Sequence, residues 1–281
     1  MNSMTWLSVS LFCEKKNWHK LLEGTSYFLK VTHNLIVCFR IEFNAFCGEN
    51  LRLCIQTYKD KATELLYMMD NYYREYFKSQ FYSNKANKQS YKGVFMHFPV
   101  NTIQFGLFST DILSEYDAEY HLFSDNLSEI MLSAFKEEID DEIILSFCYY
   151  LNVAMAKAAI SNGIHLKDFL PDAAQEAGNI GMLETDSVIS DIAEEVMQNE
   201  VFDADLYWIN SWYSCCYSHF LRLKSCKTND RKKTGDDYLY LFRSLCNQLG
   251  IAELGAYSVL TWTKSSLTEY LNKQKNRDKN I

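Results

Sequence analysis

Three segments of the N-terminal third are predicted strands: apolar and polar residues alternate in the first and third, and the second is rich in β-branched and aromatic residues. The segments are Trp6–Cys13, Leu35–Phe43 and Leu51–Thr57, and the turn-like stretch Phe46–Asn50 joins the last two into an expected hairpin. Two shorter strand candidates, Val94–Phe98 and Thr102–Phe108, follow later in the chain. These patterns predict a small, mostly antiparallel sheet.

Apolar residues at spacings of three and four dominate the rest of the chain and predict helices. The predicted helices are Asn17–Leu29, Lys59–Gln80, Tyr116–Glu138, Glu142–Ser161, Ser187–Gln198, Asp203–Lys224, Asp236–Leu249 and Ala252–Lys273. The stretches 82–92 and 163–185 lack this spacing and are predicted loops, the second with a short helix. Strands and helices are thus segregated. This favours an α+β fold, with a strand-rich N-terminal third packed against a helical C-terminal two-thirds, in a single domain over residues 1–281.

Composition narrows the class of protein. The chain has 281 residues, is 48% hydrophobic and carries a formal net charge of −8. It can therefore bury a core, and nucleic acid is not an expected partner, because binding to phosphates relies on Lys and Arg. The nine cysteines are odd in number and include no C-x-x-C pair. This argues for reduced, buried thiols in a cytoplasmic protein rather than a disulfide framework or a zinc site.

Several other classes of protein are not expected either. The most apolar stretch, Ile143–Ile160, is interrupted by Ser146, Asn152 and Lys157, which predicts a buried helix rather than a membrane span. Residues 1–12 lack the charged start and the cleavage site of a signal peptide. The sequence has no glycine-rich phosphate loop, no nucleophile elbow and no pair of histidines at metal spacing. We therefore expect neither a metal nor an organic cofactor.

The stretch Leu206–Lys224 places hydroxyls, a histidine and an arginine among aromatic residues. On a helix, Ser211 and Arg222 lie near one side, and Tyr217 flanks it. His219 is able to exchange a proton near neutral pH, and Tyr217 to donate a hydrogen bond to a developing charge. The alternative is a half-exposed helix whose polar residues are solvated or bonded to backbone groups.

Arg52 is the second candidate, because it lies mid-strand between apolar neighbours and two residues before the small Cys54. A guanidinium there would hold a carboxylate or a peptide carbonyl through a fork of hydrogen bonds. Arg40, in the preceding strand, is its expected cross-strand neighbour, which would create a local positive patch. The alternative is an ordinary salt bridge on a solvated face of the sheet.

Several of these residues fall in motifs that resemble a known family. It is the thiopeptide-type bacteriocin biosynthesis domain, which is also the C-terminal elimination domain of lantibiotic dehydratases. The resemblance rests on the Trp-led strand at Trp6, the hairpin segments Cys38–Arg40 and Asn50–Cys54, the stretch Glu119–Asn126 and the stretch Ser218–Leu223. These motifs span most of the chain and follow one another in the family's order, which is stronger support than any single motif.

The resemblance implies one of two reactions on a ribosomally made precursor peptide. Elimination domains expel a glutamyl ester from Ser or Thr, with arginines that bind the glutamyl carboxylate and a late His as acid and base. Stand-alone cyclases join two dehydroalanines in a formal aza-[4+2] cycloaddition. Loss of water and of the leader peptide then leaves a pyridine ring.

Departures from the family pattern favour the second reaction. Gln104 stands where elimination proteins carry an arginine, and Asn50 and Cys54 replace a His and an Arg of the hairpin motif. A glutamyl carboxylate without its charged partner would lose about 1.5–3 kcal/mol. Cyclases of the family depend on a Ser and a Tyr six positions apart on a late helix, and Ser211 and Tyr217 have that spacing.

The first hypothesis is therefore a pyridine-forming thiopeptide cyclase. Tyr217 and His219 would be its proton donors or relays, and Ser211 would orient the reacting amide. The predicted substrate-binding residues are Arg52, Arg222, Gln104, Trp208 and Trp212, the two tryptophans offering flat surfaces to thiazoles.

The alternatives are the glutamate-elimination subunit of a split dehydratase and a non-catalytic peptide-binding scaffold. The expected partners are the precursor peptide with its leader and other enzymes of the modification complex. No membrane partner is expected, and the chain is predicted to be a monomer or a homodimer.

Overall fold

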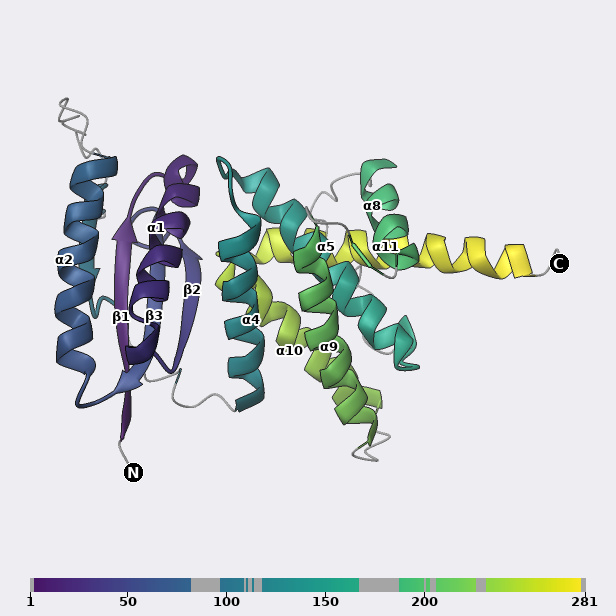
Figure 1. Cartoon of the computed structure of the whole chain (residues 1–281). Coiled ribbons are helices and arrows are strands. Elements are labelled where there is room, and N and C mark those ends of the chain that lie inside the picture. Colours follow the sequence, from purple (N-terminus) through teal and green to yellow (C-terminus); the bar gives the residue numbers. More distant parts are fainter. Residues whose placement is uncertain are drawn as a thin grey trace. The chain divides into compact units, whose positions relative to one another are not determined.

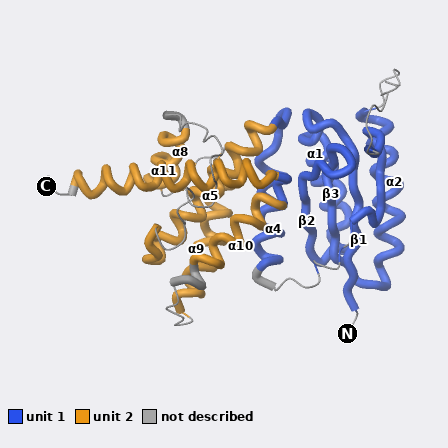
Figure 2. The backbone as a smooth tube through the Cα atoms, turned by 180° about the vertical axis from the view of Figure 1, so that it is seen from behind, with its two compact units in different colours: residues 1–140, 248–250 blue, residues 141–247, 251–281 orange. Residues whose placement is uncertain are grey.

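The computed structural model describes residues 3–81, 97–108, 110, 113, 118–166, 187–199, 201–202, 206–225 and 231–278 (Figure 1). The chain divides into two compact units, residues 1–140 with 248–250 and residues 141–247 with 251–281 (Figure 2). Within the described ranges, the strands all belong to the first unit, which confirms the α+β class with N-terminal strands. The assignment of residues 1–281 to a single domain stays a prediction. The predicted loop 82–92 and most of the predicted loop 163–185 lie outside the described residues.

The first unit contains a four-stranded antiparallel sheet. Its strands are β1 (Met4–Phe12), β2 (Cys38–Asn44), β3 (Asn50–Tyr58) and β4 (Thr102–Phe105), in the order β2-β3-β1-β4. The predicted hairpin is confirmed as β2–β3. β4 ends three residues before its predicted end, since Gly106 adopts a φ of 64°, a left-handed conformation that ends the extended strand. Of the predicted strand 94–98, residues 94–96 lie outside the described part, and His97 and Phe98 are not in a strand.

Two helices, α1 (Trp18–Val31) and α2 (Ala62–Gln80), cover the apolar face of this sheet. Leu51, Leu53 and Ile55 of β3 all point to this face by alternation and are fully buried. The indole of Trp18 stacks on Phe43 of β2 at a centroid distance of 4.6 Å. This face supplies the hydrophobic core of the unit, as the strand pattern predicted.

Helix α4 (Ala118–Ala134) runs along the outer edge of the sheet, beside β2 (Figure 1). The backbone N–H of Ile41 donates to Oγ of Ser128 at 3.0 Å. This bond satisfies a donor that an edge strand would otherwise leave without a partner. The helix therefore covers this edge at Ile41 and positions polar side chains next to β2.

The second unit is helical. Its described helices are α5 (Asp141–Ser161), α8 (Ser187–Gln198), α9 (Tyr207–Ser225), α10 (Arg231–Gln248, whose last residue belongs to the first unit) and α11 (Glu253–Asp278). α5 packs against α8, α9 and α11. Asn152 of α5 receives a hydrogen bond from the Tyr238 hydroxyl at 2.8 Å and donates one to Thr263 at 2.9 Å. These buried bonds join α5 to α10 and α11. They also satisfy the polar atoms of the buried Asn152 amide, which would be costly to leave without partners.

Among the described helices, α5 alone is long and apolar enough to cross a membrane by length and composition. In the structure, 67% of its apolar window is buried against the rest of the protein. The core helix of a globular unit has this composition as well.

Candidate functional site

Two of the predicted binding residues lie in one row across the sheet. Arg52 of β3 pairs with Ser10 of β1, and Ser10 pairs in turn with Gln104 of β4. Glu42 of β2 lies opposite Arg52 and completes the row. Residues paired across strands share a face, and neighbouring strands are about 4.8 Å apart, so Arg52 and Gln104 start about 10 Å from each other. Strand register thus brings the two together.

Arg52 is held by groups on three sides. One terminal nitrogen of its guanidinium donates to Oε2 of Glu42 at 3.1 Å, and its Nε donates to Oγ of Ser8 at 3.3 Å. The guanidinium carbon lies 4.9 Å from the ring centroid of Phe108. The residue is only 8% exposed. The salt bridge expected as the alternative is present, but it is buried rather than on a solvated face.

The expected pairing of Arg40 directly across from Arg52 is wrong. The register places Arg40 opposite Cys54, because alternation along β2 sets the next inward position, Glu42, against Arg52. Arg40 also donates from Nε to the carboxylate of Glu42. Its terminal nitrogen NH1 donates to the hydroxyl of Tyr120 at 2.9 Å and to Oγ of Ser124, also on α4, at 2.8 Å.

Arg40, Glu42 and Arg52 therefore form a buried cluster of two cations and one anion, called here the arginine cluster. Burial by itself lowers the pKa of Arg40, but the nearby Glu42 and Tyr120 oppose this and raise the pKa above its usual value. Arginine is positively charged in proteins, so the three side chains together carry a formal charge of +1. Guanidinium groups in general donate well to carboxylate and carbonyl oxygens.

The tryptophans of α9 pack against α5. The indole nitrogen of Trp212 donates to the backbone carbonyl of Leu151 at 2.9 Å, and Trp212 is only 2% exposed. Its ring therefore belongs to the core of the second unit. Trp208 is half-buried, with its ring 4.8 Å from that of Phe147. Of these two predicted thiazole surfaces, Trp208 is the one with an exposed part.

The predicted catalytic residues do not all share one side of α9. Six residues along a continuous helix separate Ser211 from Tyr217 by about 120° around the axis. By the same geometry, Arg222 lies within about 20° of Ser211 and His219 within about 80°. Arg222 is exposed, His219 is only 6% exposed, and the ring of Tyr217 lies 5.8 Å from Tyr213. Ser211, His219 and Arg222 thus group together, and Tyr217 projects elsewhere.

These two sets of residues belong to different units. Arg52 and Gln104 lie in the first unit, and the candidate residues of α9 lie in the second. The structure brings Arg52 and Gln104 together in the first unit. In the second unit it groups Ser211, His219 and Arg222, while Tyr217 lies apart from them and Trp212 is buried in the core.

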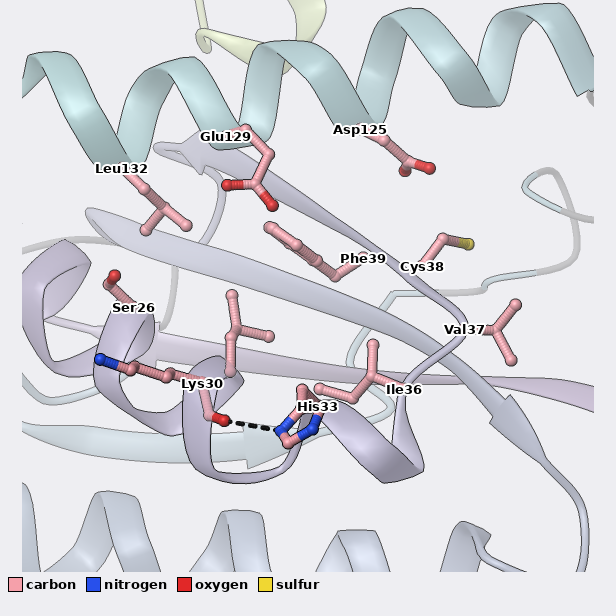
Figure 3. A pocket seen from close by; sticks show the side chains of 11 residues that line it. Ser26, Lys30, His33, Ile36, Val37, Cys38, Phe39, Asp125, Glu129 and Leu132 are labelled. Atoms are coloured by element: carbon pink, nitrogen blue, oxygen red, sulfur yellow. Dashed lines mark hydrogen bonds between the residues drawn. The ribbon is translucent and has the colours of Figure 1, made fainter.

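A cavity that sequence reasoning did not find lies in the first unit between α1, α4 and the start of β2 (Figure 3). It has a volume of about 480 Å³. Asp125 and Glu129 of α4 line one side, Lys30 and His33 line another, and Phe39 lies between them. Asp125 is inside the stretch Glu119–Asn126 that the family motif singled out. The four-residue spacing from Asp125 to Glu129 on one helix face was the available signal.

The pKa of both carboxyl groups of this cavity is raised. Burial raises the pKa of Asp125 to about 7, against the opposing effect of Arg40, and Glu129 adds to the rise. Burial also raises the pKa of Glu129. The Cys38 thiol at the same cavity has a pKa raised to about 12 by burial and by the charge of Asp125. The thiol is therefore not a nucleophile at neutral pH.

Comparison with known proteins finds similarity in structure but no match in sequence. No protein-family model matches the sequence. No curated protein matches it either. Among solved structures, the pyridine synthase TbtD from thiomuracin biosynthesis is similar over 94% of this chain and 98% of that chain, with a TM-score of 0.58 and 12% sequence identity. The tRNA-dependent lantibiotic dehydratase MibB from Microbispora sp. 107891 is similar over 96% of this chain, with a TM-score of 0.56 and 13% identity.

This chain spans 28% of the length of that dehydratase. At these identities the likeness is one of fold: the chain has the α+β fold that a thiopeptide pyridine synthase shares with one part of a lantibiotic dehydratase. The resemblance inferred from the order of the motifs is confirmed at this level.

Proposed function

We propose that this protein is an enzyme that modifies a ribosomally made precursor peptide, and that its reaction is the pyridine-forming aza-[4+2] cycloaddition. The fold supports peptide modification in general, because both similar structures bear the names of peptide-modifying enzymes. The choice between cycloaddition and glutamate elimination rests on the arginine cluster.

A carboxylate already occupies the arginines that an elimination site would need. Arg40 and Arg52 both bind Glu42 in a buried setting, with side chains 5%, 10% and 12% exposed respectively. A glutamyl ester's carboxylate would have to displace Glu42 and leave it buried without a partner, at a cost of about 3–5 kcal/mol. The neutral Gln104 in the same row adds no charge for a second carboxylate. This is the observation that supports cycloaddition over elimination.

A cycloaddition substrate has no glutamyl carboxylate, so the site needs no charged partner for one. One dehydroalanine supplies the alkene, and the second, with the adjoining amide as its imidic acid, supplies the azadiene. Two C–C bonds form, because the nitrogen lies inside the azadiene, and loss of water and of the leader as its amide makes the ring aromatic. Holding both ends of a flexible peptide together supplies most of the acceleration. Arg52 and Gln104 would bind neutral backbone carbonyls during this step.

The proton transfers are assigned to the side of α9 that carries Ser211 and His219. His219 would exchange protons during tautomerisation and loss of water, and Ser211 would orient the amide that becomes the imidic acid. Arg222 and the exposed part of Trp208 would flank the bound peptide. Tyr217 projects from a different side of the helix, so its role is tested separately.

The test is incubation with a leader-bearing peptide that carries thiazoles and two dehydroalanines, followed by mass spectrometry. The proposal expects loss of one water and release of the leader. His219→Gln and Ser211→Ala should lower the rate by about 100-fold or more. Ser214→Ala, the same substitution at an exposed position of α9, is the matched control and should leave the rate unchanged.

Three outcomes would contradict the proposal. Elimination from a glutamylated precursor, with no cyclised product, would identify a lyase instead. Unchanged masses for both peptides, with measurable peptide affinity, would identify a non-catalytic scaffold. Equal losses in Ser211→Ala and Tyr217→Phe would overturn the assignment of catalysis to one side of α9.

A further inference from the structure

The cavity beside α4 combines an acidic side with an apolar wall. Asp125 and Glu129 project into it from α4 (Figure 3). Ile36, Val37 and Phe39, from the start of β2, give it an apolar wall. Its volume of about 480 Å³ is in the range of cavities that bind small molecules and side chains.

The two carboxyl groups of this cavity make no ion pair within the described part of the chain. Asp125 Oδ1 is buried and has no hydrogen-bond partner among the described residues. Lys30, on the opposite wall, is exposed, and its ammonium points away from both carboxyl groups in Figure 3. The imidazole of His33 contacts the Lys30 carbonyl through Nδ1 at 3.0 Å. Within the described residues, therefore, no cation occupies the space between these two carboxyl groups.

The cavity also borders an edge of the sheet. The N–H of Ile41 points away from β3, because it donates to Ser128 of α4. Phe39, which lines the cavity, is two residues earlier in the same strand, so regular antiparallel pairing would turn its N–H away from β3 as well. An extended peptide can use such a backbone group while one of its side chains enters the pocket.

We propose that this cavity binds the Lys or Arg side chain of an extended peptide partner. The charged end would lie between Asp125 and Glu129, and its aliphatic stem would pack on Phe39, Ile36 and Val37. The chain's net charge of −8 attracts basic peptides in general, and the cavity gives that attraction a specific position. The inference does not depend on the reaction proposed above, because it concerns binding alone.

The test uses the full chain with ¹³C-labelled methyl groups on Ile, Leu and Val, observed by NMR. The probes are two acetylated, amidated pentapeptides, Gly-Leu-Lys-Leu-Gly and its analogue with norleucine in place of Lys. The Lys peptide should shift the methyls of Ile36, Val37 and Leu132 in a saturable manner. The norleucine peptide should bind about 10-fold or more weakly, since it lacks the charge-assisted bonds.

Variants of the labelled chain test whether Asp125 and Glu129 bind the Lys side chain of the peptide. Asp125→Asn combined with Glu129→Gln should weaken the Lys peptide by about 10-fold or more. Glu137→Gln removes the same kind of charge at an exposed position outside the cavity and should change nothing. Lys30→Gln should tighten binding, because it removes a positive charge from the opposite wall of the cavity, which repels a bound cation.

Equal affinity for the two peptides would overturn the inference, since the cavity would then be an apolar site. Absence of shifts at the three methyls with either peptide would overturn it as well. Equal weakening by Glu137→Gln would show non-specific attraction to an acidic surface, and would contradict a specific site.

Discussion

The arginine cluster predicts a large loss of stability when Glu42 is replaced. Glu42→Gln keeps the shape of the side chain and removes the charge that Arg40 and Arg52 share. The contact with Arg52 is 3.1 Å long, and the three side chains are 5–12% exposed. Each charge-assisted bond is stronger than its neutral counterpart by about 1.5 kcal/mol, so two bonds give about 3 kcal/mol. This value agrees with the lower end of the range for breaking a buried ion pair.

The assay is urea denaturation followed by circular dichroism, with hydrogen exchange of the β2 and β3 amides to report on the first unit. Glu64→Gln is the matched control, because Glu64 pairs with Lys61 at the surface, with side chains 53% and 46% exposed. It should cost less than about 0.5 kcal/mol. Adding Arg52→Met to Glu42→Gln should recover about 1 kcal/mol or more, since it removes a buried charge that has lost its Glu42 partner.

A loss below about 1 kcal/mol for Glu42→Gln, with unchanged exchange of the β2 and β3 amides, would refute this reasoning. It would mean that water solvates both guanidinium groups. The argument that Glu42 excludes a glutamyl carboxylate would then lose its energetic basis.

Three further predictions concern stability. The pKa of Asp125 is raised from 3.8 to about 7, so the folded chain holds a proton between these values that the unfolded chain releases, and stability falls as pH rises across that window. The free energy of unfolding of Asp125→Asn should therefore equal that of the parent near about pH 4 and exceed it by about 1–2 kcal/mol near about pH 8, after allowance for partial solvent exposure. Denaturation at several pH values measures this difference, and a difference that does not change with pH would contradict the prediction. Gly250→Ala should cost about 2 kcal/mol or more in a thermal melt, because φ is 68° and a Cβ would lie 2.6 Å from the carbonyl oxygen of Phe43. Gly163→Ala, with φ of 82°, should cost less, because its Cβ would meet only Lys224 Nζ, at an ordinary contact distance of 3.9 Å. Trp212→Phe should lose about 1–3 kcal/mol, since it leaves a buried carbonyl of α5 without its donor, and an unchanged urea midpoint would refute that role.

Local patterns in the sequence were sufficient for the elements of the fold. The period of two in the strands and of three to four in the helices depends only on near neighbours, and it identified the β2–β3 hairpin and the helices. The predicted length of β4 was too great, because the pattern of apolar residues does not reveal the left-handed conformation of Gly106. A charged residue among apolar ones singled out Arg52, but its partner Glu42 was missed, although Arg40 and Glu42 are two residues apart on one strand.

The spacing of six residues between Ser211 and Tyr217 illustrates the limit of a motif. A match in sequence carried no information about direction, and the helix turns the two side chains about 120° apart. The cavity beside α4 was missed for a related reason. Its walls come from α1, β2 and α4, and no pattern within one element reveals an empty space between three.

By itself, the sequence determined the α+β class, the order of strands and helices, the apolar face of the sheet and a resemblance that the structure comparison supports at the level of fold. Each of these depends on the spacing of residue types along the chain. Only the tertiary structure decided that Arg52 shares its carboxylate with Arg40, that Gln104 lies in the same row as Arg52, and that Asp125 faces a cavity. These depend on strand register and on packing between distant elements, where a shift of one residue would turn every side chain to the opposite face.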